Sequence, residues 1–340
     1  MITDLRSDTV TRPTPAMLNA MLSAQVGDDV FGDDPTVIKL EKKTAAIFNK
    51  EAGLFCPSGT MANQIAVKVH TQPGDEVICD RTAHVYNYEG GGIAFNSACS
   101  VKLIDGNRGR FNASDVEESL NPDDIHSARS RLVVVENTSN KGGGSCWKLE
   151  DIAAIAEVCR ANKLKYHLDG ARIFNALTAT RQDPFEVGQH FDSISLCFSK
   201  GLGAPVGSVL LGSEEFIRQA RRVRKVLGGA MRQAGYLAAG GIYALDNHIS
   251  RLSEDHARAG ILADILRDLS YVDEVISPET NILIFKLSSD LTTSGFLAYL
   301  KDNQILAAAF GPQMIRFVTH LDITEEMMAH CKEVLRAYRN

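Results

Sequence analysis

The 340-residue sequence has no apolar run that approaches the ~18 residues needed to span a membrane. Its first residues, MITDLRSDTV, have neither the basic start nor the apolar stretch of a secretory signal. Positive charge is not in excess, because 36 Lys and Arg residues stand against 42 Asp and Glu residues, for a net charge of -6. We therefore expect a cytoplasmic protein that works away from membranes and has no broad basic surface for nucleic acid.

Paired cysteines are also missing. The seven cysteines are widely scattered, and no two are separated by only two residues, as they are in zinc and redox motifs. Several lie in apolar segments, where a free cysteine behaves as a small core residue. We assign them no chemistry and predict no metal site.

Short apolar segments alternate with helical patterns through the first two thirds of the chain. Strands are predicted at residues 53–56, 76–79, 101–104, 132–135, 165–168, 193–198 and 208–211. Several are apolar throughout, which is typical of strands covered on both faces. Helical spacing at 60–70 and 149–162 supplies crossover helices. The pattern predicts an α/β fold with a mostly parallel central sheet flanked by helices.

The pattern changes after residue 211. Helices are predicted at 213–226 and over roughly 232–266, and beyond Pro278 strands at 281–287 and 314–318 alternate with helices at 294–302 and 324–338. Thr324 is the expected N-cap of the last helix. We predict a large α/β domain over 1–245 and a smaller C-terminal α+β domain over 246–340, packed closely because no long linker joins them.

Three residues with reactive or charged side chains follow two of the predicted strands. Lys200 comes after strand 193–198 and opens a glycine-rich turn, while Asp169 and Arg172 follow strand 165–168. Each alone is compatible with a surface lysine, a loop acid or an ion-pair partner. If both strands belong to one parallel sheet, however, the three side chains emerge at its carboxyl edge, where open α/β sheets bind ligands.

A further candidate is the run Cys56-Pro57-Ser58-Gly59-Thr60, at the start of helix 60–70. Ser58 or Thr60 can be an ordinary helix cap, but free N–H groups and hydroxyls at a helix start also suit a phosphate. No Walker-type phosphate loop is present. A nucleophilic lysine, an acid and a phosphate cup together meet the requirements of pyridoxal phosphate.

The sequence resembles fold-type-I pyridoxal-phosphate enzymes of the aspartate aminotransferase-like superfamily and, more narrowly, the low-specificity L-threonine aldolases. The similarity extends over nearly the whole chain, through residues 4–13, 27–36, 167–172, 199–203, 229–233 and 316–320. It implies cleavage of L-threonine and L-allo-threonine to glycine and an aldehyde such as acetaldehyde. It also implies a homotetramer, built as a dimer of dimers with shared active sites.

The resemblance implies several contacts with the cofactor pyridoxal 5'-phosphate. Lys200 would bond covalently to its aldehyde, Asp169 would pair with its ring nitrogen, and Arg172 would lie near its phenolate oxygen. The phosphate would be held by a short segment consisting of Ser58, Gly59 and Thr60. Arg232 would reach the phosphate from a neighbouring subunit.

The same resemblance implies how an amino-acid substrate is held. Ser7, Arg172 and Arg316 would bind its carboxylate, for which the guanidinium fork is well suited. His84 would stack on the cofactor ring and take the proton of the β-hydroxyl. His126 would be a second histidine at that hydroxyl, contributed by another subunit.

Two alternative functions stay open, and the sequence departs from the aldolase pattern at two positions. A β-eliminating lyase or an amino-acid racemase would use the same cofactor, whereas a nucleotide-binding module without catalysis would use none. Ser139 stands where many relatives carry histidine and is followed by Lys141 and three glycines, and Phe31 stands where close relatives often carry tyrosine. These departures concern the preference between threonine and allo-threonine and the size of the β-substituent.

Overall fold

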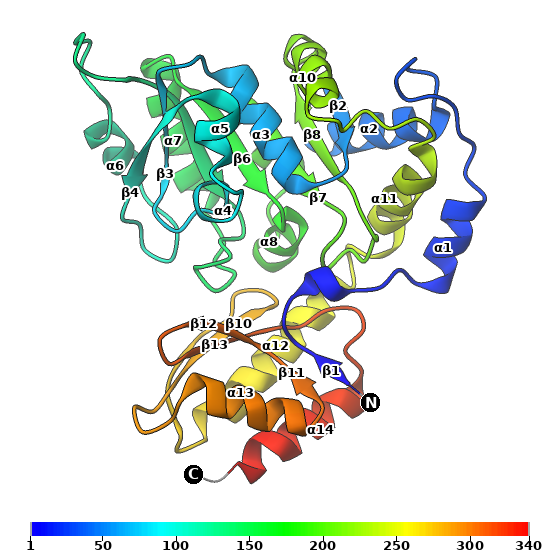
Figure 1. The fold of residues 1–340 in the computed structure, drawn as a ribbon, viewed down its shortest axis with the longest axis vertical. Coiled ribbons are helices and arrows are strands. Elements are labelled where there is room, and N and C mark those ends of the chain that lie inside the picture. The colour runs from blue at the N-terminus through cyan, green and yellow to red at the C-terminus, as the bar shows by residue number, and fades with distance from the viewer. Residues whose placement is uncertain (1, 339–340) are drawn as a thin grey trace.

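The computed structural model describes residues 2–338 and contains a seven-stranded sheet with helices on both faces (Figure 1). The strands are ordered β2-β8-β7-β6-β5-β3-β4 across the sheet. Their bounds are Ala52–Cys56 (β2), Asp75–Asp80 (β3), Ser100–Ile104 (β4), Arg129–Glu136 (β5), Lys165–Gly170 (β6), Ser193–Cys197 (β7) and Ser208–Gly212 (β8). Strand β8 runs antiparallel to the other six strands of this sheet, which are parallel to one another. The predicted α/β fold and its mostly parallel sheet are confirmed.

The inner strands of the sheet are buried on both faces, because apolar side chains point to both sides of them, whereas the edge strand β4 is partly exposed. In β5, Val133 and Val135 belong to one hydrophobic cluster, and Leu132 and Val134 belong to another. Helices α3 (Gly59–His70) and α10 (Glu214–Val226) pack over β2 and β8, and α7 (Leu149–Ala161) contacts β6. The remaining helices of this part are α1 (Pro15–Leu22), α2 (Pro35–Ile47), α4 (His84–Asn87), α5 (Gly92–Ser97), α6 (Ala113–Glu118), α8 (Ile173–Thr180), α9 (Pro184–Gly188) and α11 (Gly235–Asn247).

A four-stranded antiparallel sheet follows helix α12 (Leu252–Arg267), with the order β12-β13-β10-β9. Its strands are Val272–Ile276 (β9), Ile282–Leu287 (β10), Ala308–Gly311 (β12) and Met314–Val318 (β13), and α13 (Thr293–Asp302) and α14 (Glu325–Ala337) pack beside it. Thr324 caps α14 by accepting a hydrogen bond from the Met327 N–H, as predicted.

The N-terminal segment joins this second unit. Strand β1 (Thr3–Asp4) pairs in parallel with β11 (Ile305–Leu306), and Leu5 is buried in the C-terminal hydrophobic cluster. The domain boundary at residue 245 stays a prediction, but the start of the chain is thus held by the C-terminal unit.

The helical region predicted over roughly 232–266 consists of two helices, α11 and α12, with a break that the sequence pattern did not locate. His248 ends α11 and directs its Nδ1 to the carbonyl oxygen of Leu202, at 2.7 Å. This contact holds the junction against the large sheet, and α12 leaves it toward the second unit (Figure 1). Within residues 2–338, no helix has both the length and the apolar character needed to cross a bilayer.

Candidate active site

The side chains predicted to carry chemistry gather where the parallel strands end. Asp169 lies at the end of β6, Lys200 follows β7, and His84 begins α4 just after β3. Strands β3, β5, β6 and β7 are parallel neighbours in the sheet. Their carboxyl ends therefore share one edge, which is the edge where such sheets bind ligands.

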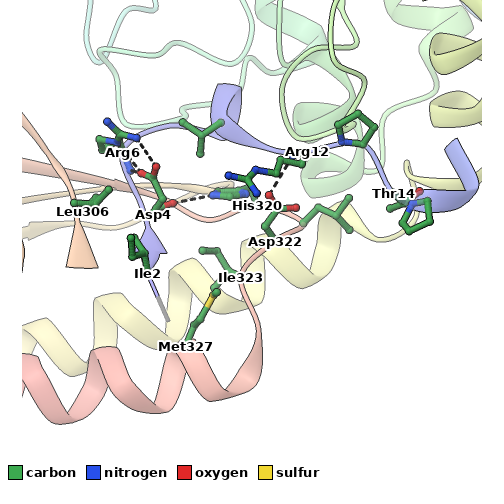
Figure 2. A pocket seen from close by; sticks show the side chains of 14 residues that line it. Ile2, Asp4, Arg6, Arg12, Thr14, Leu306, His320, Asp322, Ile323 and Met327 are labelled. Atoms are coloured by element: carbon green, nitrogen blue, oxygen red, sulfur yellow. Dashed lines mark hydrogen bonds and ion pairs between the residues drawn. The ribbon is translucent and has the colours of Figure 1, made fainter. Parts of the chain in front are cut away.

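A pocket of about 350 Å³ opens at this edge, between the large sheet and the C-terminal sheet. Its lining consists of Ser7, Thr9, His84, Tyr88, Asn140, Lys141, Arg172, Lys200, Ala309, Phe310 and Arg316. Five of the residues predicted from the sequence are thus brought together in one cavity. A larger cavity of about 890 Å³ lies between the N-terminal segment and α14, where Asp4, Arg12 and His320 face it (Figure 2). None of the predicted site residues lines that larger cavity.

The carboxylate of Asp169 is buried beside the pocket and held in a fixed orientation. It accepts hydrogen bonds from Asn63 Nδ2 at 2.9 Å and from the Ala171 N–H at 3.2 Å. Asn63 Oδ1 in turn accepts a hydrogen bond from Ser195 Oγ and contacts His167 Nε2. No ion pair involves Asp169 within residues 2–338, so its negative charge is free to meet a cationic group.

His84 is held at both its backbone and its ring. Its N–H donates to Glu136 Oε2 at 3.0 Å, and its Nδ1 lies 3.2 Å from Glu89 Oε1. Burial lowers the pKa of His84, but the hydrogen bond to Glu89 and the nearby carboxylates of Asp169 and Glu136 raise it above its ordinary value. Because Nδ1 faces a carboxylate, Nε2 is the nitrogen left to accept a proton.

Glu136 connects this histidine to the other side of the pocket. Its second oxygen accepts a hydrogen bond from the Asn140 N–H at 3.0 Å. Burial and the charge of Asp169 raise the pKa of Glu136 to about 7, although both N–H donors and the charge of His84 act against this rise. Its protonation therefore changes near neutral pH.

Arg172 is buried in a two-pronged ion pair with Asp8. Its Nε and Nη2 donate to the two carboxylate oxygens, each at 2.7 Å. Asn281 Nδ2 also donates to Asp8, at 3.1 Å, and to the carbonyl oxygen of Thr319. Burial would raise the pKa of Asp8, but the charge and hydrogen bond of Arg172 lower it strongly. A guanidinium edge that is already occupied leaves Arg172 fewer donors for a ligand than the sequence suggested.

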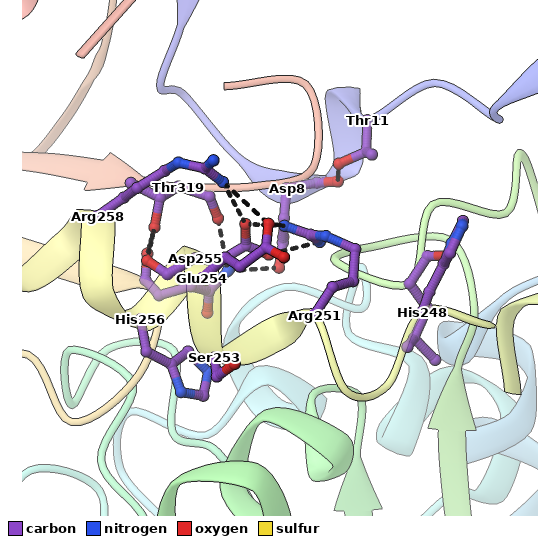
Figure 3. A network of polar contacts seen from close by, with 12 residues as sticks. Asp8, Thr11, His248, Arg251, Ser253, Glu254, Asp255, His256, Arg258 and Thr319 are labelled. Atoms are coloured by element: carbon purple, nitrogen blue, oxygen red, sulfur yellow. Dashed lines mark hydrogen bonds and ion pairs between the residues drawn. The ribbon is translucent and has the colours of Figure 1, made fainter. Parts of the chain in front are cut away.

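The C-terminal unit anchors this ion pair through a wider polar network (Figure 3). Thr319 Oγ1 donates to the backbone carbonyl of Asp255 at 2.6 Å. The Asp255 carboxylate pairs with Arg251 and lies 3.8 Å from Arg258. The position of Asp8 is therefore fixed by helix α12 and the C-terminal sheet.

Arg316 brings a second guanidinium into the pocket from β13. Its Nη1 donates to Asn140 Oδ1 at 2.8 Å and its Nη2 to the Arg6 carbonyl oxygen at 2.9 Å. Its Nε is buried without an acceptor in the described structure. Burial and the neighbouring Arg172 lower the pKa of Arg316 to about 10. A half-buried cation with an unused donor and no carboxylate partner among residues 2–338 is a site for an anionic ligand.

The predicted phosphate segment begins helix α3. Ser58 is the N-cap, and its hydroxyl accepts a hydrogen bond from the Met61 N–H at 3.1 Å. The capping explanation for Ser58 is therefore correct, but the N–H groups of Gly59 and Thr60 have no intrahelical acceptor at this helix start. A Cβ added to Gly59 would lie 2.5 Å from Cys197 Sγ, which ties this segment closely to the end of β7.

Two of the predicted residues that do not line the pocket, Arg232 and His126, are exposed on the surface of the chain. The guanidinium of Arg232 is half-exposed and pairs with Asp28 at 2.9 Å. The His126 side chain is 84 % exposed and pairs with Asp124 at 2.7 Å. His126 precedes the start of β5, whereas the pocket lies at the other end of that strand.

Sequence reasoning missed the residues that orient the site. Asp8 lies in the segment 4–13 and Asn140 lies between Ser139 and Lys141, both of which the sequence analysis had identified as informative. Their polar side chains could have marked them as candidates for the site. Glu89 and Asn63 had no such signal, because only the folded chain brings them to His84 and Asp169. His84, Glu89 and Asp169 also offer three possible metal-ligand atoms within 4.8 Å of one another. Each of the three already has a hydrogen-bond partner among its neighbours.

Comparisons with known proteins show the class to which this fold and this site belong. A family model described as beta-eliminating lyase matches residues 4–289. A low specificity L-threonine aldolase of Escherichia coli K12 is 43% identical over 98% of both chains. Low-specificity L-threonine aldolase 1 of Arabidopsis thaliana is 40% identical over 94% of this chain and 92% of its own. A threonine aldolase structure from Leishmania major shares the fold, with a TM-score of 0.84 at 21% identity and 98% coverage of each chain.

The chain therefore belongs to the beta-eliminating lyase family and, within it, to the low-specificity L-threonine aldolases.

Proposed function

We propose that this chain binds pyridoxal 5'-phosphate and cleaves L-threonine and L-allo-threonine to glycine and acetaldehyde. The observation that carries the proposal is one pocket that contains the amine of Lys200, the imidazole of His84 and the guanidinium of Arg316. The names of the full-length relatives support the same reaction.

The residues present fit the cofactor. Asp169 is a buried carboxylate without an ion-pair partner among residues 2–338, and such a group stabilises a protonated ring nitrogen. When bound, the cofactor supplies an aldehyde for the amine of Lys200 and an electron-accepting ring. Ser58, Gly59 and Thr60 at the positive end of α3 would hold its phosphate.

The substrate carboxylate would bind Arg316, with Ser7 and the remaining N–H donors of Arg172 beside it. The buried Nε of Arg316, which lacks an acceptor, supports this assignment. His84 would accept the proton of the β-hydroxyl at Nε2, since Nδ1 faces Glu89. Loss of that proton accompanies breakage of the Cα–Cβ bond and release of the aldehyde, and Cα then takes up a proton. A general base of this kind contributes about 10²–10⁴-fold to the rate.

We also propose a cytoplasmic homotetramer, assembled from two dimers that share active sites. Arg232 would reach the phosphate of the neighbouring subunit, and His126 would approach the β-hydroxyl from another one. Their exposure, 55% and 84% of the side chain, is compatible with such roles. Sedimentation gives the assembly state. An unchanged turnover in His126→Ala would remove that residue from the site.

The test uses the purified protein and each threonine diastereomer separately. We expect a yellow protein that releases acetaldehyde and glycine in equal amounts. Lys200→Ala should abolish turnover and prevent borohydride from attaching the cofactor to the chain. Release of 2-oxobutanoate with ammonia would indicate β-elimination, and formation of D-threonine would indicate racemisation. A colourless protein without turnover would overturn the proposal.

A further inference from the structure

Lys141 is a further cation in the pocket, and no part of the proposed reaction uses it. Its Nζ lies 3.9 Å from the centre of the Phe310 ring and 3.3 Å from the Phe310 carbonyl oxygen. The guanidinium carbon of Arg316 lies 4.8 Å from the centre of the same ring. Neither cation forms an ion pair with a carboxylate among residues 2–338. The positive charges of Lys141 and Arg316 repel each other across the Phe310 ring. A bound anion reduces this repulsion, so the pair favours anionic ligands.

The backbone at Lys141 is fixed, so its position is a built feature of the pocket. The Gly142 N–H donates to Ser139 Oγ at 3.1 Å, and the Gly144 N–H donates to the Ser139 carbonyl oxygen at 2.9 Å. Arg108 Nε donates to the Gly142 carbonyl oxygen at 2.8 Å. This loop is also buried from residue 142 to residue 147, so Lys141 projects from a rigid base.

Aromatic contacts place Lys141 on the side of the pocket where the β-substituent would extend. The ring centres of His84 and Tyr88 are 5.6 Å apart, and Lys141 Nζ lies 5.7 Å from the centre of the Tyr88 ring. Tyr88 thus contacts both His84 and Lys141, so a substituent next to a β-hydroxyl at His84 can extend toward Lys141. The α-carboxylate is left to Arg316, whose Nη1 is bonded to Asn140.

We propose that Lys141 is a specificity-determining residue that binds a second carboxylate, carried on the β-carbon of the substrate. The inference rests on the proposed function and extends it to β-hydroxy-α-amino acids with an acidic β-substituent. For 3-hydroxyaspartate, the Cα–Cβ bond breaks, the hydroxyl proton goes to His84, and Cα takes up one proton. The products are glycine and glyoxylate, and their atoms sum to the substrate without an oxidant or another co-reactant.

The experiment measures kcat and KM for L-threonine and for the L-3-hydroxyaspartate diastereomers. Lys141→Met keeps most of the apolar stem and removes the charge, and Lys141→Gln is a second neutral variant. Both should lose roughly 10- to 100-fold in kcat/KM on 3-hydroxyaspartate, mainly through a higher KM. Their kcat/KM on threonine should stay within about 3-fold of wild type. Lys141→Arg should retain most of the kcat/KM on 3-hydroxyaspartate. The control Lys39→Met, at an exposed site on α2, should leave kcat/KM unchanged on both substrates.

Other outcomes separate this inference from the proposed function. An equal loss on both substrates would place Lys141 at the α-carboxylate and overturn the inference. Unchanged kinetics in both neutral variants would overturn it as well. A wild-type enzyme that cleaves threonine but not 3-hydroxyaspartate would refute the inference and leave the proposed function intact. Failure to cleave threonine would remove both.

Discussion

Removing one partner of the buried ion pair between Asp8 and Arg172 should destabilise the protein strongly. Its side chains are 0% and 6% exposed, and the two hydrogen bonds between them are 2.7 Å long. Asp8→Asn preserves the shape of the side chain but leaves the guanidinium charge uncompensated, which costs about 3–5 kcal/mol in free energy of unfolding. With a urea dependence of about 3 kcal/mol/M, the unfolding midpoint should fall by at least about 1 M.

Urea unfolding at neutral pH measures this loss, and the matched control is Asp105→Asn. Asp105 pairs with Arg81 on the surface, where both side chains are more than half exposed, so its variant should unfold close to wild type. Equal midpoint shifts in the two variants would refute the reasoning.

The pH dependence of the free energy of unfolding gives a second test of the ion pair. Burial alone would raise the pKa of Asp8, but Arg172 and Lys200 hold it well below its ordinary value of 3.8. A carboxyl pKa that is lower in the folded state stabilises the fold above the ordinary pKa, and that stabilisation is lost as the pH falls below 3.8. The difference between wild type and Asp8→Asn should therefore be full at about pH 5 and smaller at about pH 3.

Three further predictions concern the pocket. His84→Phe should keep the cofactor but slow cleavage by about 10²–10⁴-fold. An unchanged rate of acetaldehyde release would place the base elsewhere. Glu89→Gln removes a negative charge that raises the pKa of His84, so the acidic limb of the kcat/KM profile should move to lower pH; an unmoved limb would contradict this. Gly59→Ala would place a Cβ 2.5 Å from Cys197 Sγ and should cost about 1–3 kcal/mol in thermal unfolding, with relief in the Gly59→Ala/Cys197→Ala double variant.

The central sheet could be predicted from the sequence because its strands are short, apolar and bounded by turn residues. Strand β5, for example, has the predicted core 132–135 within the observed Arg129–Glu136. Pairings between distant segments left no local pattern. Strand β1 has only two residues, and it is defined by its contact with β11 near the other end of the chain. The break between α11 and α12 was missed for the same reason, since His248 finds its acceptor 46 residues away.

The candidate site shows the same division. Lys200 and Asp169 could be placed at the sheet edge because each follows an apolar strand. The ion pair that occupies Arg172 was not visible, because Asp8 lies 164 residues earlier in the chain. Glu89 has no marker in its own neighbourhood of the sequence, although it is buried against His84. The side chains proposed to contact cofactor or substrate could thus be predicted from the sequence more easily than the side chains that orient them.

The pairing of β1 with β11 also affects the order of events during synthesis. Residues 3 and 4 cannot find their partner strand until residues 305 and 306 have been made. At about 5–20 residues per second, ribosomes need roughly 15–60 s for that interval. The pairing of β1 with β11, and the side of the pocket formed by Ala309, Phe310 and Arg316, can therefore form only when translation is almost finished.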